Sequence, residues 1–296
     1  MAARLSTEGL RYARAVAETG SFSAAARAQA VSQPALSNSI AKLEERLGER
    51  LFERSTRGVT PTPFGEQILP LVDKALISVD AISAEAARWT ASGDEVIRMG
   101  VSPLIDSRLV AATYDAVCCL SALPGPRRLV LREANMTELR DALLVGDLDL
   151  ILIPSVGPLP RYEHRIIASE PMVVVEPRTA DTAPMNLDDL HGKQLILMPD
   201  TCGLTTFTHE LTRTHDLKVR PYAGEASSYR VLEEWANMGL GSALVPRSKL
   251  SSADTHHRPL CLDGQEVAIF YEAVWDPNSP LASDMEILAS RLAARS

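Results

Sequence analysis

The segment SFSAAARAQAVSQPALSNSIAKLEERLGERLFER, residues 21–54, contains two short helix patterns within a chain whose formal net charge is −8. Its alanine-rich first part predicts a thin helix that a second helix can approach closely. Ser32 is suited to cap that second helix, and Pro34 fits its first turn because proline lacks an N–H that this turn leaves unpaired. The second helix is predicted to bury one apolar stripe, formed by Leu36, Ile40, Leu43 and Leu47.

The exposed residues near the start of this helix are small and polar, as a helix that enters the major groove of DNA by its N-terminus requires. Glutamine and asparagine can form two hydrogen bonds with adenine, and serine can bond to bases or phosphates. A short β-hairpin is predicted after Gly48, and its arginines are placed for phosphate contacts. The same helix spacing would also fit a small three-helix domain that binds no DNA. The predicted DNA-binding residues are Gln33, Pro34, Ser37, Asn38, Lys42, Arg54 and Arg57.

The charge of the chain is divided unevenly. Residues 1–65 carry nine Arg or Lys and six Asp or Glu, a net charge of +3, whereas the remainder carries a net charge of −11. The acidity therefore belongs to the C-terminal part, and the mildly basic N-terminal part can contact phosphates.

Five motifs within residues 10–66 closely resemble the winged helix-turn-helix of the LysR-type transcriptional regulators. They are GSFSAAA, VSQPALS, KLEERLG, LFER and TPTPFGE, in the order and spacing of that family. The resemblance implies that the start of the second helix reads bases and that Arg54 and Arg57 flank the wing. Asn38 departs from the family, in which a long polar residue such as arginine is common there, so the base preference at that point stays open.

One long helix is predicted from Phe64 to about Trp89, with Pro70 expected to bend it. Its apolar residues recur at near-heptad spacing, as in a coiled-coil seam: Phe64, Ile68, Leu71, Ala75, Val79, Ile82 and Ala86. The seam could pack on its own domain, but the resemblance implies that this linker helix pairs two subunits. Pairing would join two weakly basic DNA-reading heads and raise their avidity.

From residue 95 onward, short apolar runs alternate with helical patterns, which predicts a mostly parallel α/β sheet. The alternation breaks near residues 154–160 and 261–266, as expected where the chain leaves one lobe and returns to it. The motifs ANMTELRDALLVGDLDLILIP and EWANMGLGSALVP resemble the effector domain of the same family, which is similar to the bilobed periplasmic binding proteins.

The predicted fold is therefore an α/β effector domain of two Rossmann-like lobes, preceded by an all-α winged helix-turn-helix and a long linker helix. The predicted bounds are 1–62 for the DNA-binding domain, 63–91 for the linker helix and 95–296 for the effector domain. Within the effector domain, lobe one comprises 95–154 and 266–296, and lobe two comprises 155–265.

In such sheets, ligands bind at the carboxyl ends of the strands, where helix N-termini present free N–H groups that suit an anion. Four of the hydroxyl residues there, Ser102, Thr137, Thr201 and Ser227, would alternatively serve only as helix caps. Apolar neighbours would line the same cleft, so a small organic anion with an apolar body is the expected effector. The predicted effector-binding residues are Ser102, Pro103, Asn135, Met136, Thr137, Thr201, Cys202, Gly203, Leu204, Ser227 and Ser228.

Cys202 supports a second hypothesis, a redox-sensing regulator, because it lies in an expected ligand loop. Such a sensor needs a low thiol pKa and a resolving cysteine, and the sequence offers no obvious partner among Cys118, Cys119 and Cys261. A third hypothesis is a module that binds a small molecule without regulating DNA.

Enzymatic and membrane functions are not expected. The chain has no GxSxG motif, and its histidines lack a convincing metal-binding spacing. No catalytic site, cofactor or metal is therefore predicted. No apolar stretch approaches about 18–20 residues, and the N-terminus lacks a signal-peptide pattern, so a cytoplasmic protein is expected. The predicted partners are double-stranded DNA, a small-molecule effector and further copies of the chain, as a dimer through the linker helix and a tetramer through the effector domains.

Overall fold

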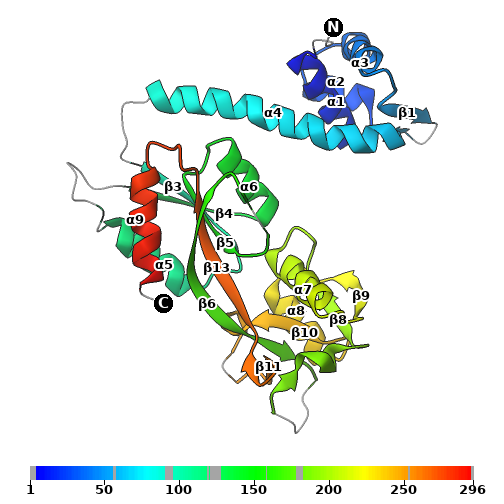
Figure 1. Ribbon diagram of the computed structural model, residues 1–296. Helices are drawn as coiled ribbons and strands as arrows, with labels where there is room; N and C mark the ends of the chain where they lie inside the picture. The colour runs from blue at the N-terminus through cyan, green and yellow to red at the C-terminus, as the bar shows by residue number, and fades with distance from the viewer. Residues whose placement is uncertain are drawn as a thin grey trace. The chain divides into compact units, whose positions relative to one another are not determined.

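The computed structural model divides into two compact units, Met1–Ala91 and Ser92–Ser296, which are described separately. Figure 1 colours the first unit in blue and cyan, and the second from green to red. The residues described are 5–55, 58–90, 96–118, 120, 128–157, 159–177, 183–252 and 254–294.

Three short helices build the head of the first unit: α1 (Thr7–Thr19), α2 (Phe22–Ala28) and α3 (Gln33–Leu47). Each begins after a serine whose hydroxyl accepts a backbone N–H from the residue three positions further on. The capping role predicted for Ser32 is confirmed, since its Oγ accepts the Ala35 N–H at 3.3 Å. Gly20 and Gly48 end α1 and α3 in the left-handed conformation that glycine adopts without strain.

The apolar stripe predicted for α3 packs in the core of the head. Leu36, Ile40 and Leu43 are buried there together with residues of α1 and α2, and Leu47 packs at the margin. Ala25 of α2 is fully buried, and its small side chain allows the close approach of the neighbouring helices.

The wing is the antiparallel hairpin of β1 (Phe52–Ser55) and β2 (Gly58–Pro61), and α4 (Pro63–Thr90) follows it. Thr62 joins the two, because its hydroxyl donates to the Arg50 carbonyl at 2.6 Å and accepts the Gly65 N–H at 2.9 Å. A Cβ at Gly65 would lie 2.1 Å from the Leu51 carbonyl oxygen, so the first turn of α4 approaches the wing as only glycine permits. The helix continues through Pro70, and the bend expected there stays a prediction.

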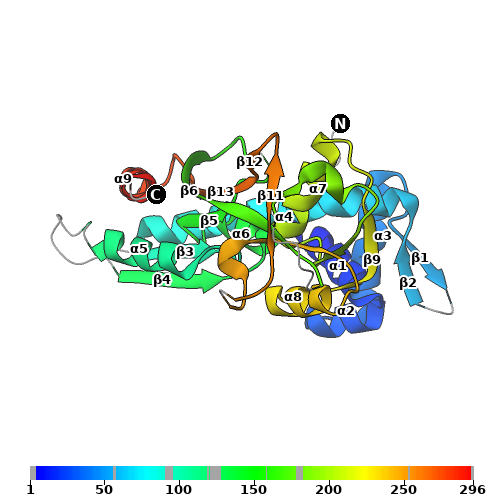
Figure 2. The same ribbon diagram turned by 90° about the horizontal axis from the view of Figure 1, so that it is seen from below.

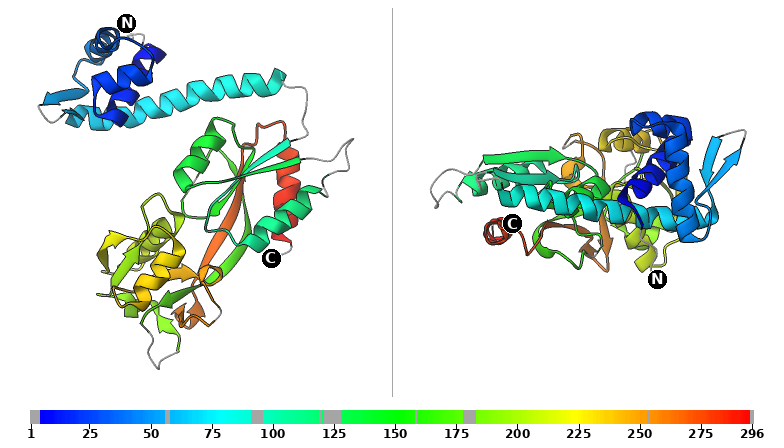
Figure 3. Two further views of the ribbon diagram at one scale, coloured as in Figure 1. Left: turned by 180° about the vertical axis from the view of Figure 1, so that it is seen from behind. Right: turned by 90° about the horizontal axis from the view of Figure 1, so that it is seen from above.

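Lobe one of the second unit is an α/β layer in which the central strand β3 pairs in parallel with both neighbours. In β5, Leu150 and Leu152 belong to one core cluster, whereas Ile151 and Ile153 belong to another. The strand is therefore buried on both faces, by α5 and α9 on one side and by α6 on the other (Figures 1 and 3). The elements are β3 (Val96–Val101), α5 (Ser107–Cys118), β4 (Arg128–Glu133), α6 (Met136–Leu144), β5 (Leu150–Pro154) and α9 (Ala282–Ala293).

Lobe two repeats this arrangement around the parallel pair β8 and β9, with β10 antiparallel to the chain's longest strand, β6. Its elements are β6 (Glu163–Val175), β7 (Met185–Asn186), the 3-10 turn Leu187–Leu190, β8 (Gln194–Leu197), α7 (Gly203–Thr214), β9 (Arg220–Glu225), α8 (Tyr229–Asn237), β10 (Ala243–Pro246), the 3-10 turn Arg247–Lys249 and β11 (Arg258–Leu262).

Two strands run side by side from one lobe to the other: β6 and β13 (Ala268–Trp275), which follows the short β12 (Gln265–Glu266) (Figures 1 and 3). They are antiparallel, and β13 is also antiparallel to β5, because one strand carries the chain out of lobe one and the other carries it back. The prediction of a mostly parallel sheet is therefore wrong, and the sheet is mixed. The predicted domain and lobe bounds stay predictions.

The continuous sheet has the strand order β12-β11-β6-β13-β5-β3-β4, with β10 joined to β6 and β7 joined to β11. Figure 2 shows β4 at the border of this sheet. Val130 and Leu131 on β4 are both exposed, and as adjacent strand residues they face opposite sides of the sheet, so neither face of this border strand is fully covered there.

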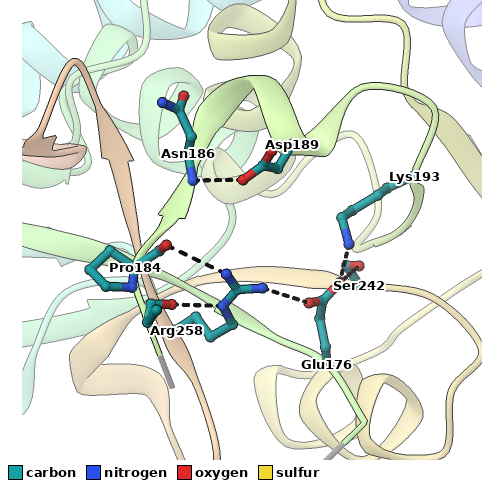
Figure 4. Close-up of polar contacts among 8 residues, drawn as sticks. Glu176, Pro184, Asn186, Asp189, Lys193, Ser242 and Arg258 are labelled. Atoms are coloured by element: carbon teal, nitrogen blue, oxygen red, sulfur yellow. Dashed lines mark hydrogen bonds and ion pairs between the residues drawn. The ribbon is translucent and has the colours of Figure 1, made fainter. Parts of the chain in front are cut away.

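A half-buried ionic network closes lobe two around Glu176, which directly follows β6 (Figure 4). Its Oε1 accepts hydrogen bonds from Lys193 Nζ and Ser242 Oγ, each at 2.7 Å, and its Oε2 lies 3.9 Å from Arg258 Nη1. Burial acts to raise the pKa of Glu176, but these hydrogen bonds and cations outweigh it and lower the pKa. The carboxylate thereby ties the end of β6 to β8, β10 and β11.

We expect Glu176→Gln to lower the free energy of unfolding by about 1–3 kcal/mol at pH 7, because charge-assisted hydrogen bonds are lost. A lowered folded-state pKa stabilises the protein fully above the ordinary value of 4.5, and this stabilisation is lost as the pH falls through the lowered pKa. The gap between wild type and variant should therefore shrink below pH 4.5 in urea titrations. Glu234→Gln, at an exposed pair with Arg230, is the control. A gap that does not change with pH would contradict the role of the charge.

Candidate functional site

The start of α3 presents the residues that the sequence analysis assigns to DNA. Gln33, Pro34, Asn38 and Lys42 are exposed, and Ser37 is half-buried. Gln33, Pro34, Ser37 and Asn38 lie in the first two turns of α3, and Lys42 lies one turn further on. The apolar stripe of the helix is buried in the head. The backbone of Arg54 lies in β1, while its side chain and the whole of Arg57 lie outside the described residues.

Ser23 of α2 contacts this surface, a feature that the sequence analysis missed. Its hydroxyl donates a hydrogen bond to the Gln33 Oε1 atom at 2.9 Å. The bond fixes the side-chain amide of Gln33 and leaves its NH₂ group, the donor end, directed elsewhere. No periodicity within either helix could reveal this bond, because it joins two helices across the turn between them.

A carboxylate of α3 binds the start of the wing. Glu44 Oε1 accepts the backbone N–H groups of Leu51 at 2.8 Å and Phe52 at 3.3 Å. The position of the hairpin relative to α3 is therefore set by a side chain of the KLEERLG motif.

In the second unit, the N-terminal ends of α6 and α7 meet. The Met136 N–H donates to the Thr201 carbonyl at 3.3 Å, and a Cβ at Gly203 would lie 2.4 Å from the Pro154 side chain and 3.3 Å from that of Met136. Only glycine allows α7 to approach lobe one this closely. Leu204 turns away into the core of lobe two.

The helices begin at residues other than those proposed as caps. The N-cap positions are Asn135 for α6, Cys202 for α7 and Ser228 for α8. Thr137, Thr201 and Ser227 are exposed and are not the N-cap residues. Ser102 is buried, and its Oγ accepts the Leu104 N–H at 3.3 Å, which closes a turn after β3 before α5 begins. The alternative in which these four hydroxyls serve only as helix caps is therefore wrong. Pro103, in the same turn, is exposed.

Lys249 connects the two lobes at this place. Its Nζ donates to the Ile105 carbonyl at 2.8 Å and lies 5.6 Å from the centre of the Tyr229 ring. Ile105 belongs to the turn of Ser102, since its N–H donates to the Ser102 carbonyl at 2.9 Å. Tyr229 OH in turn lies 3.7 Å from Cys202 Sγ. Lys249 and Tyr229 thus join the predicted effector residues of lobe one to those of lobe two.

Burial lowers the pKa of Lys249, and the charges of Glu170, Asp106 and Glu133 act in the opposite direction. Burial likewise raises the pKa of Tyr229, and Cys202 and Glu133 act in the same sense. Lys249 and Tyr229 were not among the predicted site residues. Lys249 follows β10 without a recognisable motif. Only the fold brings it back to the turn after β3.

Among the described residues, the polar partners of Cys202 Sγ are Met198 Sδ at 3.9 Å and the Tyr229 hydroxyl. Neither neighbour is a thiol that could resolve an oxidised cysteine. Cys202 and Cys261 are free thiols, and Cys119 lies outside the described residues.

Within the described part of the chain, no cluster of three or more His, Cys, Asp or Glu side chains is arranged to hold a metal ion. No helix in that part is both long enough and apolar enough to cross a membrane.

Comparison with known proteins assigns both units. Residues 7–66 match the family described as "Bacterial regulatory helix-turn-helix protein, lysR family", and residues 95–295 match "LysR substrate binding domain". The regulator IlvR of Caulobacter vibrioides is 32% identical over 257 residues, which span 80% of this chain and 81% of that protein. A Mycobacterium avium protein named "Probable hydrogen peroxide-inducible genes activator" is 31% identical over 256 residues, 81% of this chain and 77% of its own.

Solved structures show the same fold over nearly the whole chain. A full-length OxyR variant from Pseudomonas aeruginosa, which carries one cysteine substitution, has a TM-score of 0.53 at 25% identity, covering 98% of this chain and 95% of that one. CbnR, a LysR family transcriptional regulator, has a TM-score of 0.59 at 21% identity, covering 97% and 99%. The chain therefore belongs to the LysR family of transcriptional regulators, a non-enzymatic family in which a DNA-binding helix-turn-helix domain is followed by a substrate-binding domain.

Proposed function

We propose that this regulator acts in the cytoplasm as a dimer that reads double-stranded DNA with α3, and that a small organic anion bound between the lobes of its effector domain controls its output. The observation that carries the ligand part is Lys249, a half-buried cation of lobe two that reaches the backbone of lobe one.

The DNA-reading part is supported by the surface of α3. Gln33 and Asn38 are exposed near the helix start, where a major-groove helix contacts base edges. Ser23 restricts Gln33 by binding its amide oxygen, so the NH₂ group is the end presented to acceptors such as N7 or O6 of guanine. Lys42, Arg54 and Arg57 would bind phosphates and position the head.

The dimer is supported by apolar side chains of α4 that the head of the same subunit leaves uncovered. Leu69, Val72 and Leu76 pack in the core of the head, and Phe64 and Ile68 of the predicted seam pack against that core, so these residues are satisfied within the subunit. Leu71 and Ile82 of the predicted seam are 56% and 70% exposed. Exposed large apolar side chains spaced along a helix fit pairing with a second copy. Association of two dimers through the effector domains would then give the expected tetramer.

The anionic effector is supported by the surroundings of Lys249. None of the predicted effector residues is a cation, and Lys249 supplies one next to the Ser102 turn, Tyr229 and Cys202. A ligand carboxylate would compete with Asp106, Glu133 and Glu170 for this charge, so micromolar or weaker affinity, about −8 kcal/mol or less favourable, is expected. A ligand that contacts both lobes shifts the equilibrium between two lobe arrangements only if it binds one arrangement more tightly than the other.

Redox sensing through Cys202 is the second candidate. It is favoured by relatives named as hydrogen peroxide-inducible activators and by the OxyR structures, but the described contacts of Cys202 include no thiol. Cys202→Ser separates the two candidates, because an anion-responsive regulator keeps its response and a thiol sensor loses it. Sequestration of a ligand without regulation is disfavoured by the family assignment.

We expect Ser23→Ala to weaken binding to the cognate operator by about 0.5–1.5 kcal/mol, because Gln33 is no longer held in place. Binding to unrelated DNA should not change, since the contact affects base reading alone. In a Gln33→Ala background, Ser23→Ala should have no further effect in fluorescence-anisotropy titrations at fixed salt. Additive effects of the two substitutions would refute the positioning role.

Val79→Glu should dissociate the dimer, because it places a charge in the seam where two α4 helices would face each other. Analytical ultracentrifugation should show the monomer mass at micromolar concentration. An unchanged mass for Val79→Glu would mean that the seam packs within its own subunit.

Lys249→Met should weaken binding of small carboxylates by about tenfold or more, because the substitution keeps the side-chain length and removes the charge. Phenylacetate and hexanoate, measured by isothermal titration calorimetry, are suitable probes. Lys218→Met, an exposed position, is the control. Equal affinity for the corresponding neutral amides would argue against an anionic effector while leaving the family assignment intact.

A further inference from the structure

A groove of about 390 Å³ lies in the head, between α2, α3 and the segment that leads into the wing. Its floor is apolar and buried, and is formed by Phe22, Ile40 and Phe52. The other lining residues are half-buried or exposed, and they are Ser37, Ala41, Glu44 and Arg50. Ser37 is one of the residues assigned to DNA, whereas Arg50 is not. We refer to this place as the Arg50 groove.

Arg50 combines a fixed backbone with an exposed side chain. The Thr62 hydroxyl donates to the Arg50 carbonyl oxygen at 2.6 Å, and the next N–H along the chain, that of Leu51, donates to Glu44 Oε1 at 2.8 Å. Within the part of the chain that the structure describes, the Arg50 guanidinium forms no ion pair. Such a guanidinium can offer two parallel N–H groups to a phosphate.

Glu44 is the carboxylate of the described lining, and its hydrogen bonds are directed to the wing. Its Oε1 accepts the backbone N–H groups of Leu51 and Phe52 at 2.8 and 3.3 Å. Backbone N–H groups stabilise the charge of a carboxylate, so they offset part of the repulsion that Glu44 would exert on an anion. The exposed Arg50 has no such compensation, and its positive charge therefore favours an anion in the groove.

The groove lies on one flank of the exposed side of α3. Relative to Ala41, Lys42 is turned by about 100° around the helix axis. Ser37 and Glu44 are turned in the opposite sense, by about 40° and 60°. A helix in the major groove, which is about 12 Å wide, has one sugar-phosphate backbone on each flank. With α3 in the major groove, Lys42 and Arg50 therefore face different DNA strands.

We propose that the Arg50 groove binds a backbone phosphate of DNA, on the strand opposite to the one that Lys42 contacts. The inference rests on the proposed reading of DNA by α3, and it adds a contact outside the seven predicted DNA-binding residues. It also gives a role to the two hydrogen bonds that flank Arg50. Because they join its backbone to Thr62 and Glu44, the phosphate contact is held at a fixed place relative to α3 and to the start of α4.

The first test measures the salt dependence of DNA binding by the full-length protein. The probes are an operator that the wild type selects from random duplexes and an unrelated duplex of equal length. Arg50→Gln should reduce the slope of log K against log salt by about 0.9 per bound head, and weaken binding about five- to tenfold per head near 0.1 M salt. Both duplexes should respond alike, because a phosphate contact carries no sequence information.

Two further variants serve as controls. Arg50→Lys should restore the slope, because an ammonium group also binds phosphate. Arg213→Gln removes an exposed charge of the second unit and should leave the slope unchanged. Circular dichroism must show that each variant is folded. A slope that Arg50→Lys does not restore would indicate a structural role for Arg50 and overturn the proposal.

The second test locates the phosphate by methylphosphonate substitution, which removes the charge of one phosphate at a time. Neutralising the phosphate bound by Arg50 should weaken the wild type and have no further effect on Arg50→Gln. The phosphate that behaves in this way for Lys42→Gln should lie on the other strand. The proposal is overturned if Arg50→Gln leaves the slope unchanged, if it weakens only the selected operator, or if both phosphates lie on one strand.

Asn38→Ala separates this inference from the reading of DNA by α3. If repeated selection with that variant gives an unchanged operator, the reading by α3 fails, and the assignment of strands fails with it. If the selected operator changes while Arg50→Gln keeps the wild-type slope, only the Arg50 contact is overturned.

Discussion

The antiparallel pairing of β6 with β13 is the constraint on which the effector domain depends. It runs from Ala268 opposite Pro171 to Trp275 opposite Glu163, and its register shifts between Tyr271 and Glu272. Adjacent strand residues face opposite sides of a sheet, so these two side chains border different cavities. Tyr271 donates its hydroxyl to Glu170 on one side, and Glu272 holds Ser155 and His164 on the other. One strand pair thus joins the lobes and supplies polar side chains to both of their faces.

Local chemistry made much of the fold predictable. A serine before an apolar stripe determines where α3 begins, and the stripe determines which side of α3 is buried, because capping and burial act within a few residues. The alternation of short apolar runs and helices likewise indicated the α/β layers. The antiparallel direction of β6 and β13 was not predictable in this way, since about 90 residues separate them and strand direction is set by what the intervening chain packs against.

The candidate site residues divide in the same way. The exposure of Gln33 and Asn38 was predictable because position on a helix determines exposure. The place of Met136, Thr201 and Gly203 near helix starts was predictable because helices begin after strands, and their role in binding stays a prediction. Ser23 and Lys249 could not be predicted in this way, because each acts on a residue of another element. Their partners are Gln33 and Ile105, which no spacing in the sequence connects to them. The four hydroxyls proposed as caps failed for a related reason, since the exact start of a helix depends on its tertiary contacts, as the Met136–Thr201 bond shows.

The junction between wing and linker helix depends on two residues of the TPTPFGE motif. Thr62 makes two hydrogen bonds through its hydroxyl, and Gly65 approaches the Leu51 carbonyl so closely that no Cβ would fit. Leu51 is also bonded to Glu44 of α3. In the connection α3–Glu44–Leu51–Gly65–α4, the contact between Leu51 and Gly65 is backbone against backbone, and the Glu44 side chain is held by two backbone N–H groups. In the proposed dimer, a rotation of one α4 against the other would consequently be passed to α3 with little loss, which is what a regulator needs if ligand binding is to alter the spacing of its two DNA-reading helices.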